Sequence, residues 1–382
     1  MIMQIPRLFD HHNHFGFYLM LSECPTLKDV HSKTEALEIM EKLPGDRVNL
    51  VTGWHSDAFS LTPHDLSGMP PLAVINYCLH GFVVNNEASL ILKENGVEPY
   101  PKNPKDAERW TPKMLDFFGR YKTINNLPEK AAAYAEHLKK LGLYGIEDML
   151  DVLPEDFKLD GFILKRRAAF SEKAEGPLKI FADGAVGAAT AALSKGFTNG
   201  GIPVLSFTDQ ELAVMLEKGF AHSEDIAVHT IGDLACQQAV RVFKDIKPDL
   251  SGKFQLRLEH CQFIDKECAQ KAKELGIILS MQPNFSDDSV MYADRLSPEL
   301  LAANNPFRML IDECGFIPGE DLLFGSDGMP QGAASAMQSA LFPPFPGQKL
   351  SVEELLAGYK ADPAYGYINL DIDEASKKVS FA

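Results

Sequence analysis

The feature that most limits how this chain can fold is a regular alternation of short apolar segments with longer amphipathic ones. The apolar segments have the length and composition of β-strands, and they occupy residues 5–9, 144–149, 161–166, 178–182, 225–229, 254–260, 276–282 and 322–326. Segments of helical periodicity lie between most of them, at 128–141, 209–220, 234–247 and 265–275. This pattern predicts an α/β protein with a (β/α)8 TIM barrel, and 382 residues are enough for one.

Residues 20–127 interrupt the alternation. Pro-containing breaks at 62–64, 68–71, 99–101 and 103–104 surround one strand-like segment at 47–54. We therefore expect a barrel of residues 1–19 and 128–382, with residues 20–127 as an insertion or lid subdomain. Loops at the mouth of a barrel often carry function, so Trp54, His55 and His80 are expected to contact substrate. The alternative for Trp54 is a place in the core of a small subdomain.

The first strand ends in Asp10-His11-His12-Asn13-His14. Successive side chains of a strand point to opposite faces, so His12 and His14 lie on one face and can bind one metal ion, and Asp10 lies on that face too. Two histidines at a strand end are also compatible with solvated side chains, so the pair alone does not decide the matter.

Other metal-competent residues fall near the ends of the later strands: Lys179, His229, His260 and Asp327. Each has an ordinary alternative, as a solvated lysine, a partner of a helix start, a surface histidine beside Glu259, or a turn residue. Catalytic residues of (β/α)8 barrels lie at the C-terminal ends of the strands. The joint placement of these side chains therefore favours one site.

The same stretches resemble the amidohydrolase superfamily, and most specifically amidohydrolase family 3, the YtcJ-like metal-dependent hydrolases that include N-substituted formamide deformylase. The matching stretches are FDHHNH (9–14), LKIFADG (178–184), VHTIGD (228–233), LEHCQ (258–262), SMQP (280–283) and FGSDG (324–328). Trp54 and residues 80–87 also resemble the segment that this group inserts after the first barrel strand.

The resemblance implies a centre of one or two divalent ions, usually zinc. His12, His14 and Asp327 would hold the more buried ion, His229 and His260 the more exposed one, and Lys179, as a carboxylated lysine, would bridge them. A metal-activated hydroxide would attack a carbonyl carbon while Asp327, the catalytic residue, moves the proton to the leaving nitrogen. Gln282 is expected to contact substrate. The implied reaction is hydrolysis of an amide-type, non-peptide C–N bond in a small molecule.

Two alternatives stay open. One is a deaminase or cyclic-amidine hydrolase of the same superfamily with a single metal, which does not need the bridging lysine. The other is a non-catalytic barrel that binds a metal or ligand, although a structural ion would normally have a closed ligand shell and no proton shuttle. Family members also usually carry a β-sandwich, which we expect to be absent or vestigial here.

Charge and composition limit the classes of molecule that this chain is expected to bind. A formal net charge of −16 opposes binding to nucleic acid or anionic membranes, which favours small-molecule chemistry. We find no signal peptide and no apolar run long enough to span a membrane, and we expect a cytoplasmic protein, compatible with a homo-oligomer. The six cysteines lack a CxxC pair, so we expect reduced thiols.

Overall fold

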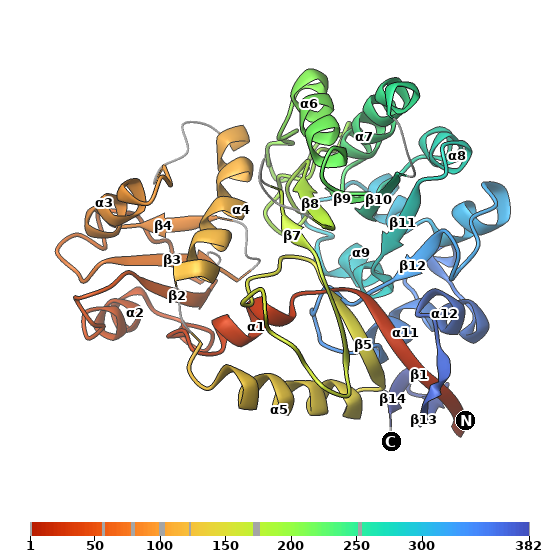
Figure 1. Cartoon of the computed structure of the whole chain (residues 1–382), viewed down its shortest axis with the longest axis horizontal. Helices are drawn as coiled ribbons and strands as arrows, with labels where there is room; N and C mark the ends of the chain where they lie inside the picture. The colour runs from red at the N-terminus through yellow and green to blue at the C-terminus, as the bar shows by residue number, and fades with distance from the viewer. Residues whose placement is uncertain are drawn as a thin grey trace. The chain divides into compact units, whose positions relative to one another are not determined.

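A computed structural model describes residues 2–55, 58–77, 81–98, 104–121, 124–170, 176–250 and 254–381. The chain divides into two compact units (Figure 1). The larger unit comprises Met1–Gly16 and Asn126–Ala382, and the smaller one comprises Phe17–Asn125. The helix α1 (Phe15–Leu21) carries the chain from the first unit into the second.

Parallel strands form the centre of the larger unit, and each predicted strand segment overlaps one of them, while the two-residue strand β7 was not predicted. They are β1 (Ile2–Asn13), β5 (Leu143–Asp148), β6 (Ile163–Arg166), β7 (Ala168–Ala169), β8 (Leu178–Phe181), β9 (Asp225–Thr230), β10 (Gln255–His260), β11 (Ile278–Met281) and β12 (Leu322–Phe324). Two further strands follow, β13 (Asp362–Asp373) and β14 (Lys378–Phe381). Two sheets result, with the orders β14-β13-β1-β5-β6 and β12-β11-β10-β9-β8-β7. The larger unit is thus a mixed α/β fold, and its strand ladders do not by themselves form one closed ring over the described residues.

The two sheets meet at the stretch that contains β6 and β7, which are separated by Arg167 alone. The Arg167 N–H donates to the Asp148 carbonyl of β5 (2.9 Å), and the Ala168 N–H donates to the Pro177 carbonyl, just before β8 (3.0 Å). This stretch therefore borders β5 on one side and β8 on the other.

The strand β12, at the other end of its sheet, lies close to β1, the middle strand of the first sheet. The Asp327 N–H donates to the His12 carbonyl (2.7 Å) just beyond the end of β12. Gly325 approaches β1 so closely that a Cβ there would lie 2.4 Å from the His12 nitrogen, so a residue without a side chain is required. This close approach brings the loop after β12 against the histidines of β1.

The β1 strand is longer than predicted, because its first half pairs outside the parallel sheet. Ile2–Pro6 pairs antiparallel with β13 (Asp362–Asp373), which in turn pairs antiparallel with β14 (Lys378–Phe381). These three strands lie together at the two ends of the chain (Figure 1). We expected a β-sandwich to be absent or vestigial, and in the described part of the larger unit β1, β13 and β14 form this small antiparallel arrangement.

Helices connect the strands of the larger unit, and α6, α7 and α8 lie along one face of β8 to β10 (Figure 1). The α helices are α5 (Leu127–Lys140), α6 (Asp209–Phe220), α7 (Asp233–Ile246), α8 (Lys266–Glu274), α9 (Asp288–Met291), α10 (Pro298–Ala303), α11 (Ala334–Leu341) and α12 (Val352–Gly358). Short helical turns are η1 (Lys247–Asp249), η2 (Pro283–Asp287), η3 (Met309–Glu313) and η4 (Pro346–Gln348). Local sequence sets their starts, as where Thr208 and Glu211 form a reciprocal capping box at α6.

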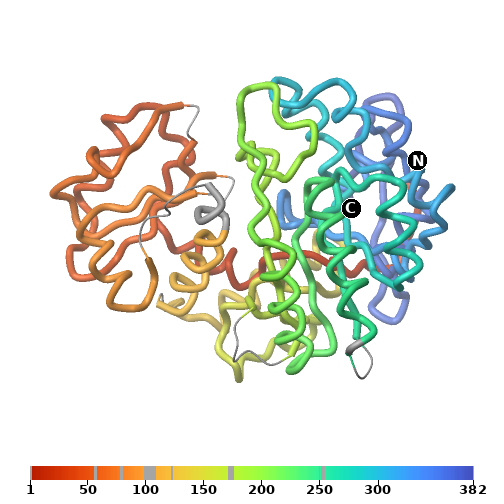
Figure 2. Tube along the Cα trace, turned by 90° about the horizontal axis from the view of Figure 1, so that it is seen from above, coloured from red at the N-terminus to blue at the C-terminus, as the bar shows by residue number. Residues whose placement is uncertain are grey.

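Two long loops at the C-terminal ends of the strands pack on each other. The loop after β8 contributes Val186 and Leu193 to a buried cluster, and the segment after β11 contributes Leu296 and Leu300. The Arg295 carbonyl also accepts from Thr198 N (2.9 Å), and the two segments lie side by side in yellow-green and light blue in Figure 2. This packing joins the loop after β8 to the segment after β11.

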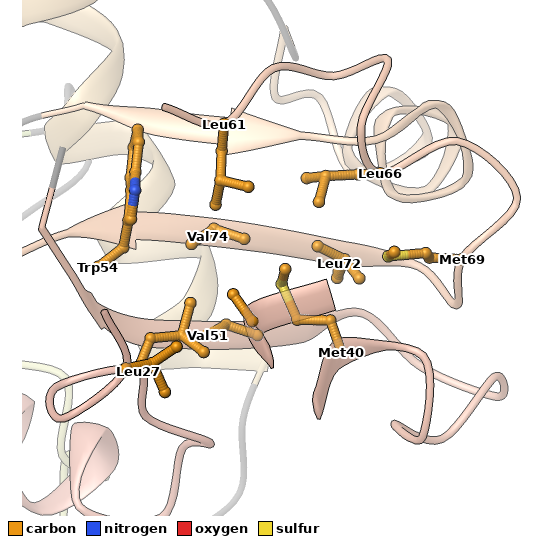
Figure 3. Packing of buried hydrophobic residues seen from close by; sticks show 11 residues of the cluster. Leu27, Met40, Val51, Trp54, Leu61, Leu66, Met69, Leu72 and Val74 are labelled. Carbon is orange, nitrogen blue, oxygen red and sulfur yellow. The ribbon is translucent and has the colours of Figure 1, made fainter. Parts of the chain in front are cut away.

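The smaller unit has its own sheet and core. Its strands β2 (Asn49–Trp54) and β3 (Leu72–Asn76) are parallel, and β4 (Phe82–Val84) pairs antiparallel with β3. Its helices are α2 (Lys33–Met40), α3 (Asn86–Glu94) and α4 (Pro104–Tyr121). Figure 3 shows Trp54 packed with Val51, Leu61 and Val74 in the buried cluster of this unit.

Two expectations about the whole chain can be compared with the described residues. None of the helices there is both long and apolar enough to cross a membrane. The cysteines that are described are free thiols, namely Cys24, Cys236, Cys261, Cys268 and Cys314, while Cys78 lies outside the described residues.

Candidate metal centre

The predicted ligands from opposite ends of the sequence meet at the C-terminal ends of the strands. His12, His260 and Asp327 each offer a ligand atom, and these atoms lie within 4.8 Å of one another. The His229 ring lies 4.5 Å from the His260 ring, centroid to centroid, and His14 Nε2 lies 2.9 Å from Asp327 Oδ1. The structure therefore gathers all four histidines and the aspartate named from the sequence.

Hydrogen bonds fix the orientation of two of these rings. His12 Nδ1 lies 2.6 Å from Glu259 Oε2, and His260 Nδ1 lies 2.6 Å from Gln282 Oε1. Carboxylate and amide oxygens only accept, so each Nδ1 carries the hydrogen and each Nε2 is the nitrogen left for a ligand. Gln282 thus contacts a histidine in this structure, while its predicted contact with substrate stays a prediction.

His229 is held in the opposite sense. Its Nε2 lies 3.0 Å from the Gly184 carbonyl, which can only accept, so Nδ1 is the nitrogen available to a metal. The buried Asp183 carboxylate lies beside it and accepts from the backbone N–H groups of Ile231 (2.9 Å) and Gly232 (2.8 Å). Asp183 thereby ties the loop after β8 to the end of β9, where His229 lies.

Lys179 is buried within β8, and its Nζ has no hydrogen-bond partner among the described residues. Burial lowers the pKa of Lys179 to about 8, although the Glu259 and Asp327 carboxylates act in the opposite direction. A buried amine without a partner is rare in native proteins and calls for an additional group at this point. A lowered pKa also makes the neutral, nucleophilic amine accessible near neutral pH.

Asp327 is the carboxylate of the cluster. Burial would raise its pKa, but contacts with His12 and His14 hold that pKa well below its usual range, so the group is ionised. Burial also lowers the pKa of His260 well below its ordinary value, which keeps that ring neutral and able to bind a metal. Left-handed backbone at His260 (φ 72°), Cys261 (φ 49°) and Asp327 (φ 58°) places strain at two of the strand ends, as is common at functional sites.

Asp10 has a role that the strand pattern did not reveal. It is buried, and it accepts hydrogen bonds from Ser326 N (2.9 Å), Ser326 Oγ (2.5 Å) and Asn13 Nδ2 (2.8 Å). It therefore fixes the loop that carries Asp327 to the end of β1. The available signal was a carboxylate directly after the apolar pair Leu8-Phe9 and directly before the histidines.

Glu259 supports a ligand in a way that the sequence did not predict. The alternative for His260 was a surface histidine beside Glu259, but Glu259 is fully buried and binds His12 and Arg257. Glu259 precedes a site histidine in a parallel strand that is buried on both faces, so the sequence could have predicted that it is buried. Its partner on β1 could not be predicted from the sequence.

The residues predicted to contact substrate from the insertion have mixed placements. Trp54 is 8 % exposed, and its Nε1–H donates to the Phe59 carbonyl (2.9 Å), which matches the alternative reading of a core residue. The His55 ring stacks on Tyr77, with centroids 4.5 Å apart. His80 lies outside the described residues. Substrate contact by these side chains stays a prediction.

The donor set can be compared with what divalent ions require. Imidazole nitrogens and a carboxylate oxygen are the ligands that Zn²⁺ and related ions take in catalytic sites, where three protein ligands leave a position open. The partnerless Lys179 amine lies in the same buried region, since it interacts electrostatically with His12 and Asp327. The residues present therefore fit a divalent ion.

Comparison with known proteins identifies similar chains. Residues 3–367 match the model of the amidohydrolase family. The chain is 25 % identical to YtcJ of Bacillus subtilis over 338 residues, which cover 73 % of this chain and 61 % of YtcJ, so it spans less than two thirds of that relative. It also resembles two solved structures of uncharacterized metal-dependent hydrolases. One is from Pyrococcus horikoshii OT3 (TM-score 0.69, 21 % identity, 97 % of this chain and 86 % of that one). The other is from Pyrococcus furiosus (TM-score 0.66, 22 % identity, 95 % and 82 %).

Proposed function

Because the chain belongs to the amidohydrolase family, we propose that it hydrolyses an amide-type, non-peptide C–N bond in a small molecule with the help of a divalent metal, most simply zinc. Family membership makes it a hydrolase. The observation that carries the finer proposal is the convergence of histidine nitrogens and an ionised Asp327 beside the Lys179 amine, which has no hydrogen-bond partner among the described residues. A purely structural metal site would need neither the buried Lys179 amine nor the Asp327 carboxylate on its left-handed backbone.

We assign the metal ligands by position. His12, His14 and Asp327 would hold one ion, and His229 and His260 would hold a second. Lys179, once carboxylated, would present oxygens to both. When bound, the metal supplies Lewis acidity, which polarises a carbonyl group and makes a water molecule more acidic.

Asp327 is the residue proposed to move the proton. Its Oδ1 lies 2.9 Å from His14 Nε2 and 3.3 Å from His12 Nε2, so Oδ1 faces the proposed ligands, and Oδ2 is the oxygen proposed to exchange a proton with the reacting groups. With its pKa held low, Asp327 starts as a base, takes a proton from water and delivers it to the leaving nitrogen. The backbone bond from Asp327 N to the His12 carbonyl keeps this carboxylate beside the β1 histidines.

We further propose that the two parallel sheets are parts of one (β/α)8 barrel. The hydrogen bonds at Arg167 and Ala168 on one side, and at Asp327 and His12 on the other, support this arrangement. The likeness to the two Pyrococcus structures supports it at the level of fold. The smaller unit would serve as a lid and contribute substrate contacts, for which His55 and His80 stay the predicted residues.

The test combines metal analysis with turnover. Protein stripped with a chelator should be inactive on a panel of N-formyl, N-acyl and cyclic amides, and Zn²⁺ should restore turnover of at least one class. Asp327→Asn keeps the shape and one oxygen donor, so it should retain much of the metal while kcat falls about 10²- to 10⁴-fold. A parent protein that binds metal but hydrolyses no amide, with Asp327→Asn unchanged in metal content, would refute the hydrolase mechanism.

A further inference from the structure

A chain of buried ion pairs leads from His12 into the interior of the larger unit. Glu259 contacts His12 through Oε2 and the guanidinium of Arg257 through Oε1. Arg257 Nη1 then donates to Glu147 Oε2 (2.7 Å), and its Nη2 donates to the His11 carbonyl (3.1 Å). Each oxygen of Glu259 therefore faces one N–H donor, and neither oxygen is in contact with solvent.

The chain continues to the opposite end of the strands. Glu147 Oε1 accepts from Arg167 Nη2 (2.7 Å), and the same Arg167 nitrogen binds Asp225 Oδ2 (2.7 Å). Arg167 and Glu147 are both buried, while the Asp225 side chain is 39 % exposed. The network thus joins residues from β1, β5, β9 and β10 with the residue between β6 and β7.

Packing alone does not require such a network. The interior of a (β/α)8 barrel is normally filled by branched apolar side chains, and replacing buried ion pairs with apolar groups is often neutral or stabilising. The charges of this network are also unbalanced, because the two guanidinium groups of Arg257 and Arg167 face three carboxylates. These are Glu259, Glu147 and Asp225. Two positive and three negative groups leave one negative charge in excess, and the chain ends at a proposed cation site.

We propose that Glu259, held in place by Arg257, is a positioning residue that fixes the His12 ring so that Nε2 faces the metal. The inference rests on the proposed function and deepens it. Because Glu259 accepts a hydrogen bond from His12 Nδ1, it sets both the tautomer and the rotation of the ring. Mutation of such a partner commonly lowers metal affinity about 10- to 100-fold. Arg257 supplies the second donor that stops the carboxylate from turning away.

Glu259→Gln is a sharp test because of the donor count. Two donors, from His12 Nδ1 and Arg257 Nε, face the two oxygens of Glu259. Glutamine offers one oxygen and an NH₂ group, so one of these donors must meet another donor. Since arginine stays protonated, the oxygen should turn to Arg257, and the NH₂ group should force His12 into the tautomer whose Nε2 carries hydrogen and cannot bind metal.

Glu147→Gln is the matched control. It makes the same change in the same network, also between N–H donors, but within the described part of the chain the hydrogen bonds of the Glu147 side chain go to two arginines and to no histidine ring. A general loss of packing or charge balance would affect both variants alike. Positioning of His12 is altered by the first variant alone.

The measurement is the dissociation constant of the chelator-treated protein for Zn²⁺ and for Co²⁺, whose visible absorption reports ligand geometry, together with apo-protein melting temperatures. We expect both variants to melt at lower temperature, while Glu259→Gln alone binds the metals roughly 10- to 100-fold more weakly and alters the Co²⁺ spectrum. Equal affinities for the parent and Glu259→Gln, or an equal loss in both variants, would overturn the inference.

A further variant covers the case in which Glu259→Gln does not fold. Arg257→Lys keeps the charge but cannot donate to Glu259 and Glu147 with two separate nitrogens in the same geometry, so metal affinity should again fall. An unchanged affinity in Arg257→Lys would then overturn the inference. A parent protein that takes up neither metal would instead refute the proposed function, so the two failures are distinguishable.

Discussion

Asp148 at the end of β5 should destabilise the larger unit at neutral and alkaline pH. It is buried, its Oδ2 accepts from Gly16 N (2.8 Å), and its Oδ1 has no hydrogen-bond partner within the described part of the chain. Burial raises the pKa of this carboxyl from 3.8 to about 7, against the opposing effect of the Gly16 hydrogen bond. The folded state therefore holds a proton that the unfolded chain has already released.

The sign and size of the effect follow from linkage. Below pH 3.8 both states are protonated and the group makes no difference. Between pH 3.8 and about 7 the unfolded state alone is ionised, so stability falls as pH rises, and above pH 7 the full cost remains. At about 1.4 kcal/mol per pH unit this cost is about 4 kcal/mol. Asp148→Asn is neutral at every pH and should be more stable than the parent by about 2–4 kcal/mol at pH 8, with no gain near pH 4.

The assay is urea unfolding of both proteins between pH 4 and pH 8.5 in the presence of a chelator. Both tryptophans, Trp54 and Trp110, belong to the smaller unit, so unfolding of the larger one should be followed by circular dichroism. Asp151→Asn is the matched control, because Asp151 is paired with Arg166 (2.8 Å) and its loss should not increase stability at any pH. A difference between Asp148→Asn and the parent that does not grow with pH would refute the reasoning.

Three further predictions concern the site. Lys179→Ala should lower the metal content, measured by elemental analysis, from two ions per chain to one or fewer. If Lys179 is carboxylated, added short carboxylates should partly restore the metal content. An unchanged metal content would exclude Lys179 as a ligand. Gly325→Ala should destabilise the larger unit by about 3 kcal/mol or more in urea unfolding, because its Cβ would lie 2.4 Å from His12 N; an unchanged midpoint would contradict this. Gln282→Leu removes the acceptor for His260 Nδ1 and should weaken Zn²⁺ binding roughly 10- to 100-fold in chelator competition; a rise in KM with unchanged metal affinity would show that Gln282 acts on substrate instead.

Local sequence by itself determined most of the secondary structure and the residues of the candidate site. Strand length, apolar composition and helix signals are local, so the segment 209–220 was predicted with the bounds that α6 has. The site histidines were found because a parallel strand places its functional residues at its C-terminal end, a rule that needs no knowledge of contacts. The same locality explains why the long β1 strand was predicted too short: its first half pairs with β13, about 360 residues away in the sequence.

Only the tertiary structure decided which side chains support the ligands. Glu259 stands next to His260 in the sequence but binds His12, which is 247 positions away, and Asp10 binds Ser326, which is 316 positions away. A carboxylate buried in a strand must find a donor, but the donor is chosen by which strands lie side by side and by the close approach that Gly325 permits. Sequence periodicity gives the face of a strand and not its neighbour. The chemistry of the ligands was therefore readable from the chain, while their orientation depended on contacts between distant strands.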